Sequence, residues 1–138
     1  MATRSNIGYM MPNGNIRSVY CHWDGYPSNN GRILQEHYQS AYKIAQLVEL
    51  GDLSSLDAEI GRQVDFDDRE AQQGQCVYYG RDRGESGVET QEVSDVQDFV
   101  QNDYAYLWTG TEWVLYTPAT GNVGIALSDV LEHQEVMM

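Results

Sequence analysis

The Asn13-Gly14 dipeptide constrains the fold of this chain more than any other short feature of its sequence. It follows Pro12 and lies between two runs of extended character, 3–11 and 15–22. Asn-Gly favours the tight turn that joins two antiparallel strands, because both residues tolerate a positive φ. The sequence therefore predicts a β-hairpin at the start of the chain.

Alternation within the second run assigns its side chains to two faces, because successive residues of a strand point to opposite sides of a sheet. One face carries Ile16, Ser18, Tyr20 and His22, and the other carries Arg17, Val19, Cys21 and Trp23. The adjacent Cys21 and His22 therefore cannot bind one metal ion unless a bulge intervenes.

Helical spacing appears next, over 32–50, where apolar residues recur every three or four positions. Ser40 lies where this spacing changes phase, so we expect it to cap a second helix, which Gly51 would end in the left-handed conformation. Residues 52–56 have short helical or turn character. The polar, aperiodic stretch 61–74 predicts a surface loop.

Two further hairpins are predicted in the second half of the chain. The first would run from a strand at 75–80 through a charged turn at 81–85 to a returning strand at 88–93. The second would pair 104–109 with 112–117, where Tyr, Trp and Leu side chains alternate as paired strands require.

The remaining elements complete an α+β prediction. Ser94 and Gln97 match a capping box that would start a short helix, and the tail 118–138 holds a possible helix over 128–134. Taken in order, the elements predict a single domain over 1–138. We expect a mainly antiparallel sheet built from β-hairpins, with two to four helices packed on one face.

Charge and apolar patterning exclude several function classes. The chain has 8 basic and 21 acidic residues and a net charge of −13, which disfavours nonspecific binding to nucleic acids or to anionic membrane surfaces. No apolar run is long enough to span a membrane, and the start of the chain lacks a secretory signal, so we expect a cytosolic protein. In a reducing cytosol, Cys21 and Cys76 are read as small buried hydrophobes.

The densest candidate site is the segment from Tyr20 to Pro27. It offers aromatic rings, an imidazole and a carboxylate at a strand end that leads into a loop of Gly, Pro and Asn residues, in the members Tyr20, His22, Trp23, Asp24 and Tyr26. A structural alternative stays open. The rings could be core residues, the histidine could be structural, and the carboxylate could accept hydrogen bonds from its own turn.

A second candidate site is the segment from Cys76 to Glu85. Seven of the eight cations in the chain are arginines, whose planar guanidinium groups suit phosphate or carboxylate. Arg81 and Arg83 follow paired tyrosines, so they could hold a phosphate while Tyr79 stacks on a base. Alternatively, Asp82 and Glu85 neutralise both arginines within the turn.

Patterns typical of enzymes and metal sites are absent from the sequence. There is no Walker loop, no dinucleotide-binding fingerprint and no Cys-x-x-Cys, and His22, His37 and His133 do not have metal-ligand spacing. The acidic stretch 65–68 lacks the glycine and distal glutamate of a calcium loop. We therefore predict no catalytic residue, no metal and no cofactor.

Two blocks of the sequence are distinctive: Y-C-H-W-D-G-Y-P at 20–27 and Y-G-R-D-R-G-E at 79–85. Three others accompany them: M-A-T-R-S-x-I-G at 1–8, G-x-I-L-x-x-H-Y at 31–38 and L-G-D-L-S-S-L at 50–56. In these blocks, over roughly residues 1–116, the chain resembles a widespread family of small bacteriophage-encoded accessory proteins. The loop 61–74 and the tail 118–138 look variable.

Small phage accessory proteins often counter host defence, so the resemblance implies a viral, anti-defence protein of the host cytoplasm. In the first hypothesis the protein is a cyclic oligonucleotide sponge, a homo-oligomer that binds a nucleotide immune signal without cleaving it. Arg4, Arg81 and Arg83 would neutralise phosphates, and Trp23, Tyr26 or Tyr79 would stack on bases. The alternatives are an acidic nucleic-acid mimic that inhibits a host nuclease or CRISPR effector, and a small phosphodiesterase-like enzyme.

Overall fold

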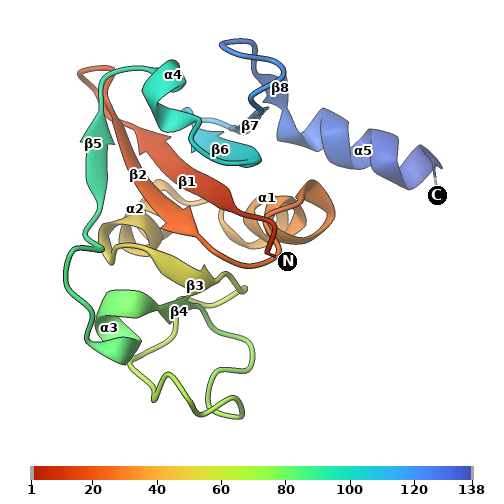
Figure 1. Cartoon of the computed structure of the whole chain (residues 1–138). Helices are drawn as coiled ribbons and strands as arrows, with labels where there is room; N and C mark the ends of the chain where they lie inside the picture. Colours follow the sequence, from red (N-terminus) through yellow and green to blue (C-terminus); the bar gives the residue numbers. More distant parts are fainter. Residues whose placement is uncertain (1, 138) are drawn as a thin grey trace.

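One mixed, mostly antiparallel sheet organises the computed structural model, which describes residues 2–137, with side chains over 2–133 (Figure 1). Its eight strands are β1 (Ser5–Met10), β2 (Ile16–Cys21), β3 (Leu53–Ser55), β4 (Val77–Tyr78), β5 (Gln91–Val93), β6 (Tyr104–Trp108), β7 (Trp113–Tyr116) and β8 (Ile125–Ala126). Their order is β4-β3-β2-β1-β6-β7-β8, and β5 also pairs with β2. The pairs β1–β6 and β2–β3 are parallel, and the other pairs are antiparallel.

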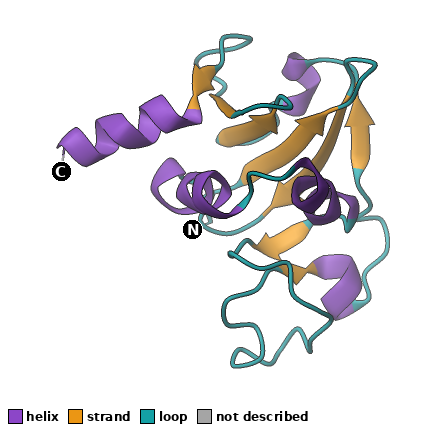
Figure 2. Cartoon of the chain, turned by 180° about the vertical axis from the view of Figure 1, so that it is seen from behind, coloured by secondary structure: helices purple, strands orange, loops and turns teal. Residues whose placement is uncertain are grey.

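Helices cover both faces of this sheet. They are α1 (Arg32–His37), α2 (Ala41–Glu49), α3 (Tyr79–Arg83), α4 (Val96–Phe99) and α5 (Leu127–Met137), preceded by a π-helix, η1 (Pro27–Gly31). The larger core joins α1, α2 and α5 to one sheet face, and a smaller core joins α4 to the other face (Figures 1 and 2). Successive side chains of β6 point to opposite faces of the sheet, so the strand contributes to both cores. Tyr106 lies in the larger core and its neighbour Leu107 in the smaller one. The predicted α+β class and mainly antiparallel sheet are confirmed, whereas the helices differ from the expected two to four on one face, because α4 packs on the other face and the described residues form five α-helices.

The hairpins predicted at the start of the chain and over 104–117 both form. β1 and β2 are antiparallel, with Ser5 opposite Cys21 and Met10 opposite Ile16. The turn between them contains Gly14 at a φ of 88°. β6 and β7 are joined in the same way.

The predicted break between two helices is also confirmed. The Ser40 hydroxyl accepts a hydrogen bond from the Lys43 backbone N–H and caps α2. Gly51 follows α2 at a φ of 93°, a left-handed conformation that favours glycine. The chain therefore leaves α2 in the direction of β3.

Three predictions for the middle of the chain are wrong. The segment 52–56 contains strand β3, because its backbone carbonyls accept hydrogen bonds from the chain that follows β2. The predicted hairpin between 75–80 and 88–93 does not form, since β4 pairs with β3 and β5 pairs with β2. The charged turn 81–85 instead overlaps helix α3, which ends at Gly84 with a φ of 76°.

Two further differences are small. Asp95, rather than Ser94, caps α4, and its carboxylate accepts a hydrogen bond from the Asp98 backbone N–H at 2.8 Å. The C-terminal helix begins at Leu127, one residue before the predicted 128–134. Among residues 2–137, no helix is long and apolar enough to cross a membrane.

Candidate functional site

A pocket of about 670 Å³ lies where the strand end after β2 meets β3, β4, α3 and the 61–74 loop. This junction is the lower part of the molecule in Figure 1. The lining residues are His22, Trp23, Asp24, Ser54, Ser55, Phe66, Arg69, Gln72, Val77, Tyr79 and Arg83. The pocket therefore brings together the two segments that the sequence singled out, although they are far apart in the chain.

Pairing with β3 fixes the first of these segments in the pocket wall. The backbone N–H of His22 donates to the Leu53 carbonyl at 3.1 Å, and that of Trp23 donates to the Ser54 carbonyl at 3.0 Å. The His22 and Trp23 rings meet edge to face, with centroids 4.6 Å apart. Trp23 remains 46% exposed, so it is not the core ring that the structural alternative proposed.

The turn after Trp23 has a special backbone conformation. Asp24 has a φ of 55°, which is uncommon for a residue other than glycine. Gly25 follows, and a Cβ atom there would lie 2.9 Å from the Thr3 carbonyl oxygen. The close approach of these two backbones explains a glycine at this position.

The second segment supplies an arginine and a ring. α3 carries Tyr79 and Arg83, and the Arg83 guanidinium lies over the rings of Phe66 and Tyr79, 5.1 and 5.9 Å from their centroids. The side chain of Arg83 is 51% exposed and approaches one carboxylate, that of Glu85, at 3.4 Å. Burial raises the pKa of Tyr79, so its hydroxyl stays protonated. An exposed surface ion pair of this kind is weak, so the guanidinium remains available to a ligand.

The 61–74 loop forms the wall that the sequence did not predict. It contributes Phe66, Arg69 and Gln72. The Phe66 ring packs on Tyr79 with centroids 5.7 Å apart, and the Gln72 side-chain amide donates to the Phe66 carbonyl at 2.6 Å. Only the unusual use of arginine in the chain could have drawn attention to Arg69, because the loop has no periodicity.

Arg81 does not line the pocket, and its assignment as a phosphate ligand needs correction. Its guanidinium donates to the Asp82 carboxylate at 2.9 Å and to the Ile60 and Cys76 carbonyls at 3.0 Å each. It also lies 4.8 Å from the centroid of the Tyr78 ring. Most of its donors are thus directed to partners inside the protein. The self-neutralising alternative describes Arg81, whereas Arg83 faces the pocket.

Asp82 connects several parts of the structure. Its side chain is fully buried and accepts hydrogen bonds from the backbone N–H groups of Tyr78 at 2.8 Å and Val64 at 3.0 Å. The carboxylate thereby joins β4, α3 and the 61–74 loop. Together with Arg81 it sets the position of the residues that do line the pocket.

Besides Arg81, three predicted site residues lie outside the pocket lining. Tyr26 lies immediately before η1, and its side chain is 39% exposed. Arg4 lines a separate hollow beside Asn102 and Asp103. Tyr20 reaches the pocket only through His22, whose Nδ1 is 2.5 Å from the Tyr20 hydroxyl oxygen.

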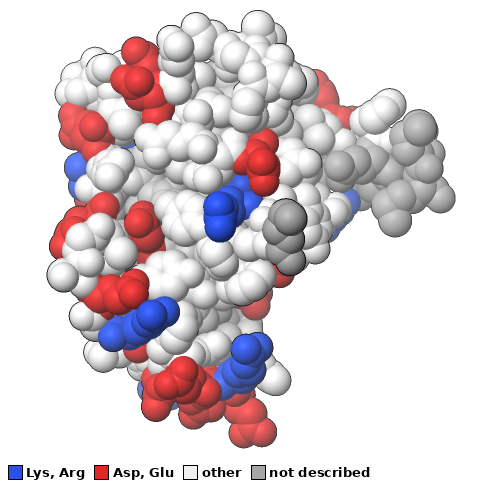
Figure 3. All heavy atoms as spheres, viewed as in Figure 1, with Lys and Arg blue, Asp and Glu red and all other residues white. Residues whose placement is uncertain are grey.

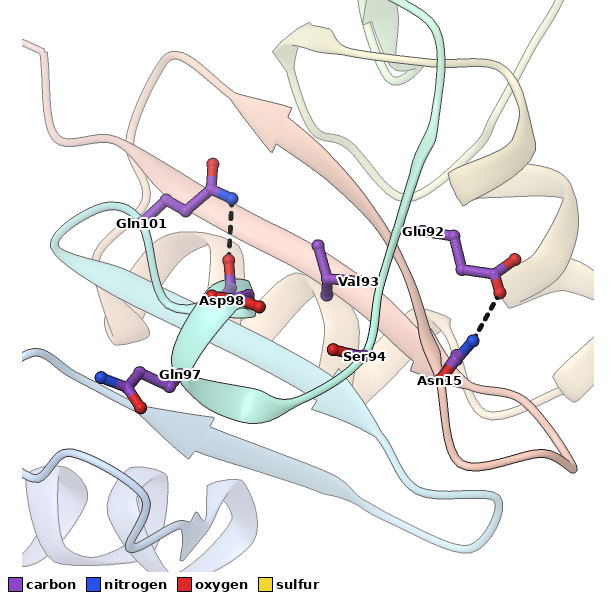
Figure 4. Close-up of a pocket in the computed structure, with 7 residues that line it drawn as sticks. All are labelled: Asn15, Glu92, Val93, Ser94, Gln97, Asp98 and Gln101. Carbon is purple, nitrogen blue, oxygen red and sulfur yellow. Dashed lines mark hydrogen bonds between the residues drawn. The ribbon is translucent and has the colours of Figure 1, made fainter.

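A second pocket, of about 640 Å³, lies between α4 and the start of β2 (Figure 4). It is lined by Asn15, Glu92, Val93, Ser94, Gln97, Asp98 and Gln101. Glu92 accepts a hydrogen bond from the Asn15 amide at 2.7 Å, and Gln101 donates to the Asp98 carbonyl at 2.8 Å. Two carboxylates and no basic residue in this lining make it unsuitable for phosphate, and it contains no predicted site residue.

The two cysteines are poorly placed for nucleophilic chemistry. Both are buried thiols, and burial raises the pKa of Cys21 to about 12 and also raises that of Cys76. Thiolates, which are the reactive form, are therefore disfavoured. Over residues 2–133, whose side chains the structure describes, His, Cys, Asp and Glu form no group that could hold a metal ion.

Comparison with protein-family models, curated proteins and solved structures finds no match to this chain. The resemblance to small phage accessory proteins therefore stays a prediction.

Proposed function

We propose that this protein binds a small nucleotide in the pocket between Trp23 and Arg83 and sequesters it without cleaving it. The observation that carries the proposal is the position of Arg83, whose exposed guanidinium lies over two aromatic rings in the wall of a pocket that also contains Trp23 and Arg69. A nucleotide needs both a cation for its phosphate and a ring surface for its base.

The charge of the pocket contrasts with that of the whole protein. Acidic side chains are spread over the left and lower parts of the face in Figure 3, with basic side chains among them, and the net charge is −13. Two of the eight cations nevertheless line this one pocket. A local positive site on an acidic protein suits a small anion and disfavours a long polyanion, because the surrounding acids repel the rest of a nucleic acid.

Binding without turnover is supported by the chemistry of the lining. The two thiols are buried outside it, and the Nδ1 atom of its one histidine, His22, is engaged by the Tyr20 hydroxyl. These features favour capture over hydrolysis.

The resemblance to phage accessory proteins supplies a biological setting for the proposal. In that setting the ligand is a cyclic oligonucleotide signal of host immunity, and the protein acts as a sponge in the host cytoplasm. The pocket volume of about 670 Å³ lies within the usual range for small-molecule sites. Assembly into a homo-oligomer stays a prediction, made because sponges tend to place their pockets between subunits.

The experiment compares three proteins by native mass spectrometry and calorimetry with cyclic di-AMP, cyclic di-GMP and cyclic GMP–AMP. Arg83→Ala removes the proposed phosphate contact, and Arg62→Ala is the matched control, because Arg62 is an exposed arginine of the same loop region that does not line the pocket. We expect Arg83→Ala to weaken binding about tenfold to a hundredfold, since a hydrogen bond to a charged group contributes about 1.5–3 kcal/mol. Arg62→Ala should bind like the wild type.

The form of the released ligand separates the alternatives. Heating the complex should release intact nucleotide, whereas cleaved product would identify an enzyme. No binding of any of the three probes, combined with a salt-sensitive complex with a basic nuclease, would overturn the proposal in favour of the nucleic-acid mimic. Equal binding by the wild type and Arg83→Ala would show that this arginine is structural.

A further inference from the structure

The Tyr20 hydroxyl and the His22 ring form a short contact that links the pocket to a neighbouring polar hollow. The Tyr20 oxygen lies 2.5 Å from His22 Nδ1, and the two ring centroids are 5.9 Å apart at 65°. His22 lines the pocket, whereas Tyr20 lines a smaller polar hollow with Asn6, Ser18 and Asp52. The imidazole thus contacts Tyr20, a residue that does not line the pocket.

We propose that Tyr20 is a positioning residue that fixes the tautomer of His22, so that His22 presents its Nε2–H to an acceptor atom of the bound nucleotide. The proposal rests on the proposed function for the identity of the ligand. Its structural part, the tautomer of His22, concerns the free protein and can be tested without any ligand.

The direction of the hydrogen bond follows from the surroundings of the phenol. The Tyr20 hydroxyl oxygen lies 2.5 Å from His22 Nδ1, and a side-chain hydrogen bond from Arg4 also acts on the phenol. The charged group that acts on the phenol is Arg4, whose positive charge lowers the pKa of Tyr20 against the larger raising effect of burial. A guanidinium has no acceptor atom, so the Tyr20 proton is directed to Nδ1.

A neutral imidazole that accepts at Nδ1 carries its proton at Nε2. The edge-to-face contact with Trp23, at a centroid distance of 4.6 Å, restrains the ring from its other side. His22 therefore offers a donor whose direction is set before a ligand enters. Such a donor favours ligands with an acceptor at that point, such as a phosphate oxygen or a base carbonyl.

The same arrangement gives a role to each of three residues that the sequence assigned to the site. His22 contacts the ligand, Tyr20 orients His22, and Arg4 acts on the Tyr20 phenol. Arg4 and Tyr20 thus belong to the site through a chain of contacts, although neither lines the pocket.

The first test measures the tautomer by long-range ¹⁵N–¹H correlation NMR on the free protein at about pH 8.5, where an ordinary imidazole is neutral. We expect His22 to show a proton at Nε2 in the wild type and a mixture of tautomers in Tyr20→Phe. His37 and His133 serve as internal controls that the substitution leaves unchanged. A proton at Nδ1 of His22 in the wild type would overturn the proposal, whatever the outcome of the nucleotide experiments.

The second test uses the same cyclic dinucleotides with two substitutions of the imidazole. In His22→Gln the side-chain amide nitrogen reaches about the position of Nε2, whereas in His22→Asn it reaches that of Nδ1. We expect His22→Gln to bind within about threefold of the wild type, and His22→Asn and Tyr20→Phe to bind about threefold to tenfold more weakly, as for one neutral hydrogen bond. Equal losses in His22→Gln and His22→Asn would show that Nε2 is not a donor to the ligand.

Discussion

The guanidinium of Arg83 lies over the Phe66 ring, 5.1 Å from its centroid, and so connects helix α3 to the 61–74 loop across the wall of the pocket. Phe66 also packs on Tyr79, the first residue of α3. A ring that contacts both a cation and a second ring anchors the loop at this point. Loop position and ligand contact are therefore coupled through one side chain.

Phe66→Ala should loosen the loop without unfolding the protein. The substitution removes the ring contacts to Arg83 and Tyr79, each of which contributes about 0.5–1.5 kcal/mol. We expect faster hydrogen exchange over 61–74, measured by mass spectrometry, and weaker nucleotide binding. Phe66→Tyr is the control, because it keeps the ring. Unchanged exchange over the loop would show that Phe66 does not anchor it.

Asp82→Ala should destabilise the whole fold, in contrast to Arg83→Ala. Asp82 is fully buried and accepts from Arg81 and from two backbone N–H groups, so its loss leaves two backbone donors without partners and a mostly buried guanidinium without its counter-charge. Breaking such a pair costs about 3–5 kcal/mol, whereas an exposed pair such as Arg83 with Glu85 contributes less than about 1 kcal/mol.

Urea denaturation followed by tryptophan fluorescence measures both variants. The midpoint of Asp82→Ala should fall well below that of the wild type, and that of Arg83→Ala should stay close to it. A small effect of Asp82→Ala would contradict the structural role assigned to Arg81 and Asp82. It would also reopen the possibility that Arg81 binds the ligand.

Local sequence signals predicted the parts of the fold that are set by neighbouring residues. Asn13-Gly14 specifies its hairpin, and Ser40 and Gly51 specify the limits of α2, because turn and cap conformations depend on a few adjacent positions. The segment 52–56 was not predictable in this way. It is a strand because a distant strand end supplies partners for its carbonyls.

The candidate site shows the same division between local and distant information. Trp23 and Arg83 stand out by residue type beside turns, and both line the pocket. Arg81 carries the same local signal, but the Ile60 and Cys76 carbonyls and the Asp82 carboxylate engage it in the folded chain. Phe66 was missed because nothing in the polar 61–74 stretch indicates that it folds back on α3.

Stability at acidic pH should depend on Glu49. Hydrogen bonds from Arg17, and then from Tyr9, lower the pKa of Glu49 below its ordinary 4.5. Because the folded-state pKa is lowered, the stabilisation is fully present above pH 4.5 and is lost as the pH falls through the lowered pKa. The Glu49 side chain is 41% exposed, so we expect Glu49→Gln to cost at most about 1 kcal/mol at neutral pH.

Asp52→Asn is the control with the opposite sign. Burial raises the pKa of Asp52 above its ordinary 3.8, so its charged form costs stability as the pH rises through that raised pKa. Asparagine keeps an oxygen that can accept from the Tyr20 backbone N–H. Chemical denaturation between about pH 3 and 7 measures both effects. Relative to the wild type, the free energy of unfolding of Glu49→Gln should fall further as the pH rises, whereas that of Asp52→Asn should increase. Parallel curves for both variants and the wild type would contradict these assignments.

Neither thiol should react while the protein is folded. Burial raises the pKa of Cys21 to about 12, and it also raises that of Cys76, whose sulfur lies 3.4 Å from the Tyr38 hydroxyl. At about pH 8 an iodoacetamide reaction followed by mass spectrometry should find no modification in buffer and two modifications in urea. Rapid labelling of one cysteine in the native protein would show that its side of the core opens.

Ligand binding should occur at a stoichiometry of one nucleotide per chain. One chain supplies both rings and cations to the pocket wall, in Trp23, Phe66, Tyr79, Arg69 and Arg83, and these suffice to contact one nucleotide. Native mass spectrometry of the complex with the best cyclic dinucleotide should therefore show equal numbers of ligands and chains, whatever the oligomeric state of the protein. One ligand for every two chains would contradict this expectation. It would place the functional pocket between subunits, as in the homo-oligomeric sponge that the sequence predicts, and Arg83 and Trp23 would then belong to one half of a shared site.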